Sequence, residues 1–179
     1  MPDYGHRLFY ALLPPPRQRN LIGLHRDQLG LAESIVRNDR LHITLGITDD
    51  FEHRPYDEAR RMIEIGQSIA AAPIAVTLDR LSAGNDSIAL RPSRRIGALA
   101  ELGAQLRAKL ERQELLRRDW SLKPHVTLLY RKGRPFQRTI EPLGWEATDF
   151  VLIHSILGAT QHIELGRWPL IDRQGAFGF

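Results

Sequence analysis

The sequence contains no cysteine. This absence excludes disulfide bonds, zinc or iron–sulfur sites built on thiolates, and cysteine nucleophiles. Any catalytic group must therefore come from histidine, serine, threonine, carboxylates or basic side chains.

Long hydrophobic runs are also absent. No stretch of about 18 consecutive apolar residues occurs, so the sequence predicts no transmembrane helix. The first residues, Met1-Pro-Asp-Tyr-Gly-His-Arg7, have neither an apolar segment nor a small-residue cleavage site, which argues against a secretory signal. We therefore expect a cytoplasmic protein without membrane contact.

Lysine is scarce, whereas arginine is abundant. Only Lys109, Lys123 and Lys132 are lysines among 25 basic residues, which face 21 acidic residues for a formal net charge of +4. An anionic partner is compatible with this balance, but a solvated, arginine-rich surface explains it at least as well. With 179 residues, 42% of them hydrophobic, the chain is typical of one globular domain or two small lobes.

Hydrophobic periodicity divides the chain into strands and helices. Strand segments combine β-branched or alternating apolar residues with proline or glycine at their ends, and helical segments repeat apolar residues every three or four positions. The sequence thus predicts a mixed α/β (α+β) fold. The predicted strands are Leu8–Leu13, Arg40–Leu45, Ile74–Leu81, Ser87–Arg91, Lys123–Tyr130, Phe150–Leu157 and His162–Leu165, and the predicted helices are Gln18–Leu29, Tyr56–Ala71 and Ile96–Leu116.

One order of elements occurs twice: a strand, a proline-containing turn, a helix, and a strand that carries His-x-Thr-Leu. The first copy runs from Leu8 to Leu45, and the second runs from Ile88 to Leu128. We interpret this order as an internal duplication of two α/β lobes related by pseudo-twofold symmetry.

The two His-x-Thr motifs lie in predicted strands. Because side chains alternate between faces with a period of two, His42 and Thr44 point to one face while the apolar residues beside them point to the core. His125 and Thr127 repeat this arrangement. If the lobes pack about a pseudo-twofold axis, the motifs place two imidazoles and two hydroxyls around one cleft.

This set of groups suits a small anion that needs proton transfer at both ends. Histidine titrates near neutral pH, so one imidazole can take a proton from water while the other donates one to a leaving oxygen. The threonine hydroxyls can donate hydrogen bonds to phosphate oxygens as charge develops. The motifs therefore predict in-line displacement at phosphorus without a metal.

Two other interpretations stay open. A single His-x-Thr-Leu strand is typical of a half-buried sheet face, although two copies in matched positions favour a functional site. A histidine metal site is the second alternative, but no carboxylate lies at ligand spacing beside either motif and threonine is a poor ligand. We expect neither a metal nor another cofactor.

Four segments of the sequence resemble the 2H phosphoesterase superfamily, in particular the RNA 2′,3′-cyclic phosphodiesterases that are also called 2′-5′ RNA ligases (LigT-like proteins). The resemblance spans essentially the whole chain and implies one domain, residues 1–179, of two intertwined lobes. Two antiparallel sheets would line a central cleft, with the helices outside. The four segments are His42-Ile-Thr-Leu45, Pro124-His-Val-Thr-Leu128, Arg7-Leu-Phe-Tyr-Ala-Leu12 and Leu165-Gly-Arg-Trp-Pro-Leu170.

The resemblance also implies an activity, the metal-independent hydrolysis of a terminal RNA 2′,3′-cyclic phosphate to a 2′-phosphate. By this resemblance, His42 donates the proton to the departing 3′ oxygen and His125 accepts the proton of the attacking water. Thr44 and Thr127 hold the phosphate. The expected substrates are RNA ends or cyclic nucleotides, and we expect a monomer.

Further residues near the motifs are candidates for substrate contact. Arg131 shares strand parity with His125 and Thr127, so we predict that it adds a phosphate contact, with a solvated strand end as the alternative. Phe9 and Tyr10 could stack on a base, although a place in the core is the more common role for such aromatics.

The remaining histidines and the basic run 131–138 are weaker signals. His154 is expected in the core, and His6, His25 and His53 are expected at the surface. We expect no catalytic residue in the last hairpin, which contains His162. The basic run 131–138 is either an RNA-facing loop or a solvated one.

Three alternative functions stay open beside hydrolysis. The first is the ATP-independent joining of RNA ends through a 2′-5′ bond. The second is a 2H phosphodiesterase activity on another cyclic phosphate metabolite. The third is a non-catalytic module that binds RNA ends.

Overall fold

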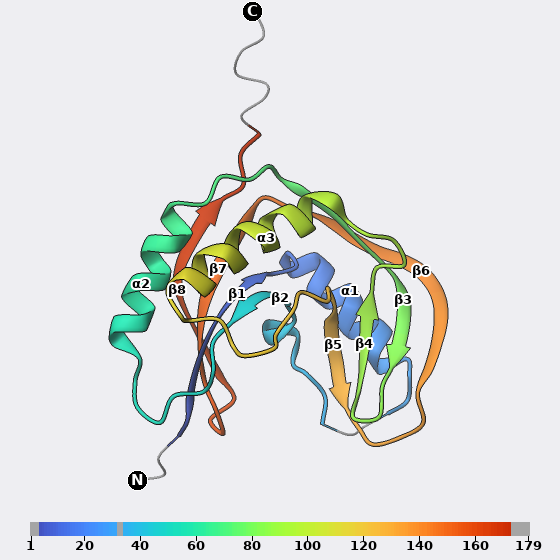
Figure 1. The fold of residues 1–179 in the computed structure, drawn as a ribbon. Helices are drawn as coiled ribbons and strands as arrows, with labels where there is room; N and C mark the ends of the chain where they lie inside the picture. The colour runs from blue at the N-terminus through green and yellow to red at the C-terminus, as the bar shows by residue number, and fades with distance from the viewer. Residues whose placement is uncertain (1–3, 32–33, 173–179) are drawn as a thin grey trace, which may run out of the picture.

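The computed structural model describes residues 4–31 and 34–172 (Figure 1). No helix in these ranges is both long and apolar enough to cross a membrane. In chain order the elements are β1 (His6–Leu12), α1 (Pro16–Asp27), a 3-10 turn (Asn38–Arg40), β2 (Ile43–Ile47), α2 (Tyr56–Gln67), β3 (Ile74–Ala83), β4 (Ser87–Arg91), α3 (Gly97–Arg112), β5 (Val126–Tyr130), β6 (Phe136–Ala147), β7 (Asp149–Ile156) and β8 (Gln161–Pro169).

The strands form two four-stranded antiparallel sheets. The first sheet has the order β2-β1-β7-β8, and the second has the order β5-β4-β3-β6. In each sheet the strand with a His-x-Thr motif lies at one edge and pairs with the strand that begins its copy of the repeat. The predicted α+β class with two antiparallel sheets and outer helices is confirmed.

The connecting helices cross between the two halves of the molecule. Helix α1 follows β1 of the first sheet in the chain but contacts β5 and β6 of the second sheet. Helix α3 follows β4 of the second sheet but contacts β2 of the first. Helix α2 packs on β7 and β8 and touches α3 (Figure 1). Helices α1 and α3 therefore each cover the sheet of the other half of the repeat.

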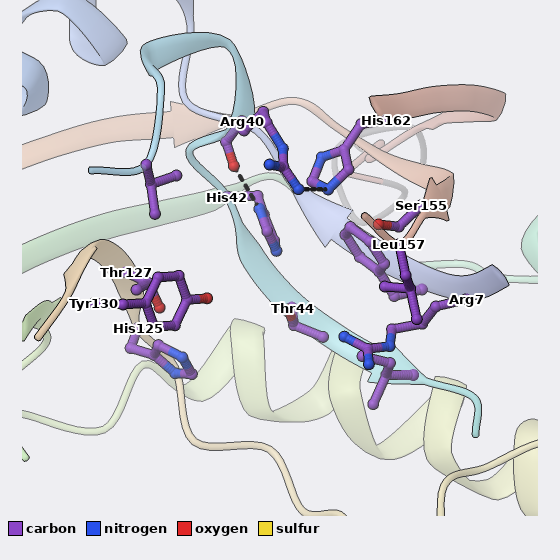
Figure 2. Close-up of a pocket in the computed structure, with 13 residues that line it drawn as sticks. Arg7, Arg40, His42, Thr44, His125, Thr127, Tyr130, Ser155, Leu157 and His162 are labelled. Atoms are coloured by element: carbon purple, nitrogen blue, oxygen red, sulfur yellow. Dashed lines mark hydrogen bonds between the residues drawn. The ribbon is translucent and has the colours of Figure 1, made fainter. Parts of the chain in front are cut away.

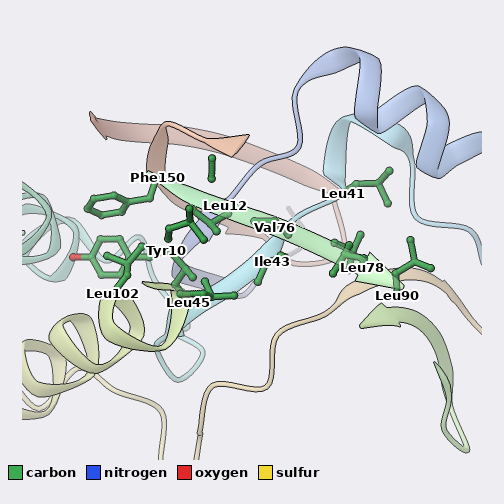
Figure 3. Packing of buried hydrophobic residues seen from close by; sticks show 14 of the residues in the cluster. Tyr10, Leu12, Leu41, Ile43, Leu45, Val76, Leu78, Leu90, Leu102 and Phe150 are labelled. Atoms are coloured by element: carbon green, nitrogen blue, oxygen red, sulfur yellow. The ribbon is translucent and has the colours of Figure 1, made fainter. Parts of the chain in front are cut away.

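One hydrophobic core runs through both sheets. On the first sheet Tyr10 and Leu45 face inward, and on the second sheet Leu78 and Leu90 do so (Figure 3). The Tyr10 hydroxyl, fully buried, donates a hydrogen bond to the Met62 carbonyl at 2.5 Å. Tyr10 is thus a core aromatic and cannot stack on a base. The buried residues of α3 follow the predicted spacing: Leu99, Leu102, Leu106 and Leu110.

Matching irregularities in the two sheets support the duplication. Thr44 pairs with Ala11, and the register between β1 and β2 then shifts by one residue. Thr127 pairs with Ala89, and the same shift follows between β4 and β5. A β-bulge at the same place in both copies is a retained structural feature. The sequence signal for two related lobes therefore corresponds to two related strand pairs.

The loop between α1 and β2 ties the two motif strands together. The Val36 amide donates to the Leu128 carbonyl at 2.9 Å, and the Tyr130 amide donates to the Ser34 carbonyl at 3.0 Å. This short segment thus adds to the free edge of β5 only a few residues before His42. The distance between the two motifs is therefore set by main-chain hydrogen bonds.

Strand β6 was not predicted. Its twelve residues include Pro142 and Gly144, and most of its side chains are exposed, so it shows no clean alternation of apolar and polar residues. It lies at the edge of the second sheet, where a missing amide donor is tolerated. Part of the basic run predicted as a loop, including Arg138, belongs to this strand.

Most predicted boundaries differ from the observed ones by a few residues. The strands with the motifs begin at Ile43 and Val126, one residue after each histidine. Helix α1 begins at Pro16. Proline is favoured at the first helical position because the amide hydrogen that it lacks would have no partner within the helix there. His6 is buried rather than at the surface, and its Nδ1 lies 3.0 Å from Nε2 of the buried His154.

Candidate active site

The motif residues of both sheets line one pocket of about 240 Å³. Figure 2 shows His42 and Thr44 on one side and His125, Thr127 and Tyr130 on the other. The predicted convergence of the two motifs is therefore observed. The other residues that line the pocket are Arg7, Phe9, Val36, Arg40, Ile47, Ser155, Leu157 and His162.

Each motif histidine is oriented by a main-chain carbonyl two residues earlier. Nδ1 of His42 donates to the Arg40 carbonyl at 2.7 Å, and Nδ1 of His125 donates to the Lys123 carbonyl at 2.6 Å. A carbonyl only accepts, so each Nδ1 carries a proton. In the neutral ring, Nε2 is then an unprotonated acceptor. Two imidazoles in equivalent positions of the repeat thus line one cavity, each with an unprotonated Nε2 in its neutral form.

Burial holds both imidazoles in the neutral form. Desolvation is the main cause that lowers the pKa of His42 to about 4; the charges of His125 and Arg40 act in the same direction, against the hydrogen bond to the Arg40 carbonyl. Desolvation also lowers the pKa of His125, with a smaller contribution from Arg91. Both Nε2 atoms therefore accept hydrogen bonds at neutral pH. His42 and His125 are close enough for the charge of His125 to affect the pKa of His42. An anion bound between the two rings would therefore interact with both.

The two threonines occupy open positions on the sheets. Thr44 and Thr127 are half-buried, and each faces an alanine, Ala11 or Ala89, on the neighbouring strand. A small neighbour leaves the hydroxyl accessible from the pocket. The residue after each threonine, Leu45 or Leu128, is buried in the core, and further along the two strands Ile47 and Tyr130 line the pocket again.

Phe9 supports His42 instead of presenting a free surface for a base. The two rings stack with centroids 4.8 Å apart, and Phe9 is 3% exposed. His162 contacts both rings edge-on, with centroids 5.4 Å from Phe9 and 5.6 Å from His42. The His42 ring is thus fixed by stacking as well as by its hydrogen bond.

Arg40 and His162 were not predicted as site residues, although both line the pocket. Arg40 donates from Nη2 to Nε2 of His162 at 3.0 Å, so His162 is held neutral with that nitrogen as an acceptor. Burial, together with the charge of Arg40, lowers the pKa of His162 to about 3. The Nε donor of Arg40 is buried and has no protein partner in the described part of the chain. Because Arg40 lines the pocket, its guanidinium places a positive charge beside an anion bound there.

A signal for Arg40 was present in the sequence. It precedes His42 by two residues, as Lys123 precedes His125, so the repeat extends to a basic residue at each position. His162 gave no such signal, because it comes from β8, far along the chain. Tyr130, Arg7 and Ser155 also reach the pocket through tertiary packing.

Arg131 does not lie with the other predicted site residues. Its guanidinium is 5.9 Å from the centroid of the Phe136 ring, and it does not line the pocket. The prediction that Arg131 shares a face with His125 and Thr127 was wrong because the bulge after Thr127 shifts the alternation, so that Leu129 is buried in the core and Tyr130 reaches the pocket.

Comparisons with known proteins agree with this geometry. The structure of Escherichia coli LigT with 3′-AMP is 25% identical in sequence, with a TM-score of 0.78 over 94% of this chain and 99% of that one. A protein of Thermus thermophilus has the same fold at 21% identity, with a TM-score of 0.77 over 93% of this chain and 99% of that one. No curated protein matches the sequence. Residues 14–155 match the family profile of the 2′-5′ RNA ligase superfamily, and the chain belongs to this superfamily.

Proposed function

We propose that the protein hydrolyses 2′,3′-cyclic phosphate ends of RNA to 2′-phosphates. Membership of the superfamily supports action on a phosphodiester bond. The observation that carries the finer proposal is the pair of imidazoles, each with Nδ1 bound to a carbonyl, that face one pocket from two sheets. The related LigT was crystallised with a nucleotide, 3′-AMP, which supports a nucleotide in the equivalent cleft.

The proposed reaction uses one proton transfer at each end of the phosphate. Water attacks phosphorus as Nε2 of His125 takes its proton, and the bond from phosphorus to the 3′ oxygen breaks as Nε2 of His42 gives a proton to that oxygen. The product is a 2′-phosphate with a free 3′ hydroxyl. The net proton moves from His42 to His125, and solvent exchange restores the starting state.

Hydroxyl groups and a guanidinium would stabilise the negative charge on the phosphate oxygens. Thr44 and Thr127 offer one hydroxyl each, and Arg40 places its positive charge at the pocket wall. Donors fixed in advance in a partly buried site stabilise a transition state more than water does, because they need no reorganisation. Arg7 is less available, since both oxygens of the Asp50 carboxylate accept from it.

Burial of the two motif histidines lowers their pKa, so the rate is expected to fall as the pH rises. In free protein both motif histidines have a pKa below 6.5, and the reaction needs one of them protonated. As pH rises above 6.5 this singly protonated form is lost, so kcat/KM should fall about tenfold per pH unit. A bound phosphate raises the pKa of the donor, so the optimum of kcat should lie at higher pH. Profiles of both constants test this, and a kcat/KM that is constant from about pH 6 to 8 contradicts it.

The direct test is hydrolysis of an oligoribonucleotide with a 2′,3′-cyclic phosphate end in the presence of EDTA, with the product identified by phosphorus NMR. A 2′-phosphate that forms despite chelation supports the proposal. A 3′-phosphate, or turnover that EDTA abolishes, contradicts it. Joined 2′-5′ products favour ligation, and tight binding without turnover favours a non-catalytic module.

A further inference from the structure

After its first strand, the second half of the repeat carries more basic residues than the first half. Ala11 and Ala89 are equivalent, because each pairs with a motif threonine. Two residues later the first copy reads Leu13-Pro-Pro-Pro-Arg17, whereas the second reads Arg91-Pro-Ser-Arg-Arg95. The second copy therefore carries three cations in this stretch, where the first carries one.

Strand register places Arg91 beside the active site. Arg91 follows Ala89 by two residues and thus shares the sheet face of Thr127. Its charge contributes to the lowered pKa of His125. On its other side Arg91 pairs with Arg80 of β3. Like charges in directly opposite positions destabilise a sheet, so a bound anion would relieve this contact.

A groove of about 410 Å³ continues from Arg91 along the loop that joins β4 to α3. We call it the basic groove. Pro124, the residue before His125, forms part of its wall, so the groove begins next to the catalytic strand. Its lining residues are Arg91, Pro92, Ser93, Arg94, Arg95, Ile96, Ala100, Leu122 and Pro124. Apolar and basic groups thus line one channel together.

Among the residues that the structure describes, the cations of the basic groove have no acidic partner. Arg91, Arg94 and Arg95 form no ion pair within residues 4–31 and 34–172. The carboxylate close by, Asp79, accepts from the Ser93 amide at 2.7 Å and from the Ser93 hydroxyl at 2.6 Å. Its oxygens therefore hold the loop in place rather than neutralise the arginines. The arginines are presented on an anchored loop.

We propose that the basic groove binds the single-stranded RNA that precedes the reacting end, so that the strand leaves the cleft over β4 and the start of α3. This inference rests on the proposed function and names its substrate class as a polynucleotide rather than a free cyclic nucleotide. Arginines contact backbone phosphates, and the apolar floor at Ile96 and Leu122 accommodates bases. The strand is placed on the His125 side because the second copy carries three arginines, Arg91, Arg94 and Arg95, where the first copy carries only Arg17.

The test compares two substrates on an Arg94→Gln/Arg95→Gln variant. The substrates are 2′,3′-cyclic AMP and an RNA of about eight nucleotides with a 2′,3′-cyclic phosphate end. We expect the ratio of kcat/KM on RNA to kcat/KM on cyclic AMP to fall about tenfold. A Lys109→Gln/Arg112→Gln variant removes the same charge from the last turn of α3 and should keep the ratio of the unmodified protein.

Binding of a 2′-phosphate-ended RNA gives a second readout that needs no turnover. The Arg94→Gln/Arg95→Gln variant should bind more weakly, and the slope of log Kd against log salt should decrease by about 1.4 for two lost phosphate contacts. If neither the ratio nor the slope changes, the basic groove does not bind RNA, and its surface contacts a protein partner or solvent instead. Weaker RNA binding without hydrolysis of either substrate supports the groove while it refutes the proposed function.

Discussion

Replacing His42 or His125 by alanine is expected to lower kcat by about 10²–10⁴-fold for each variant, because each removes one of two proton-transfer groups. The loss should appear in kcat more than in KM, since proton transfer belongs to the transition state. The double variant should lose little more than the less active single variant, because the two imidazoles act in one step. Steady-state hydrolysis of a cyclic-phosphate RNA measures all three.

The matched control is His53→Ala. His53 is exposed and outside the pocket, so its variant should keep the full rate. Thermal unfolding of every variant checks that the fold persists, which matters most for His42 because its ring packs on Phe9. A His42→Ala or His125→Ala protein that is folded and retains its normal rate would refute the two-histidine mechanism.

Replacing Thr44 or Thr127 by valine is expected to lower kcat/KM by about 10²–10³-fold. Valine keeps the shape and the strand preference of threonine, but it cannot donate a hydrogen bond to a phosphate oxygen. The loss of a fixed donor in a partly buried site removes stabilisation that water replaces poorly. The measurement is kcat/KM on the same cyclic-phosphate RNA.

Two further variants separate this effect from a packing defect. Serine keeps the hydroxyl, so Thr44→Ser and Thr127→Ser should recover most of the rate. Thr77→Val removes an exposed hydroxyl from β3 and should change neither rate nor stability. If the serine variants are as impaired as the valine variants, the hydroxyls do not bind the phosphate and the threonines serve packing.

The convergence of the two His-x-Thr motifs was predictable because their signal is local. Strand alternation alone puts His42 and Thr44 on one face, and the same holds for His125 and Thr127. The repeated order of elements then predicts that the two faces meet. The limit of the local argument is visible at Arg131, where one bulged residue reverses the alternation and Tyr130 takes the place in the pocket.

The parts of the site that were missed depend on contacts between distant segments. His162 reaches Arg40 across 122 positions of sequence. Strand β6 shows no alternation of apolar and polar residues, because it is an edge strand with mostly exposed side chains. Neither a contact of this range nor an exposed edge leaves a periodic mark in the sequence.

The sequence by itself determined the fold class, the duplication and the four motif residues, because hydrophobic periodicity and repeated motifs follow from local backbone geometry. Only the tertiary structure decided which other groups join them. The pairing of residues 34–36 with β5 sets the separation of the motifs, and the strand order brings His162 beside His42. Burial among these elements lowers the pKa of both motif histidines, since desolvation depends on every segment that excludes water.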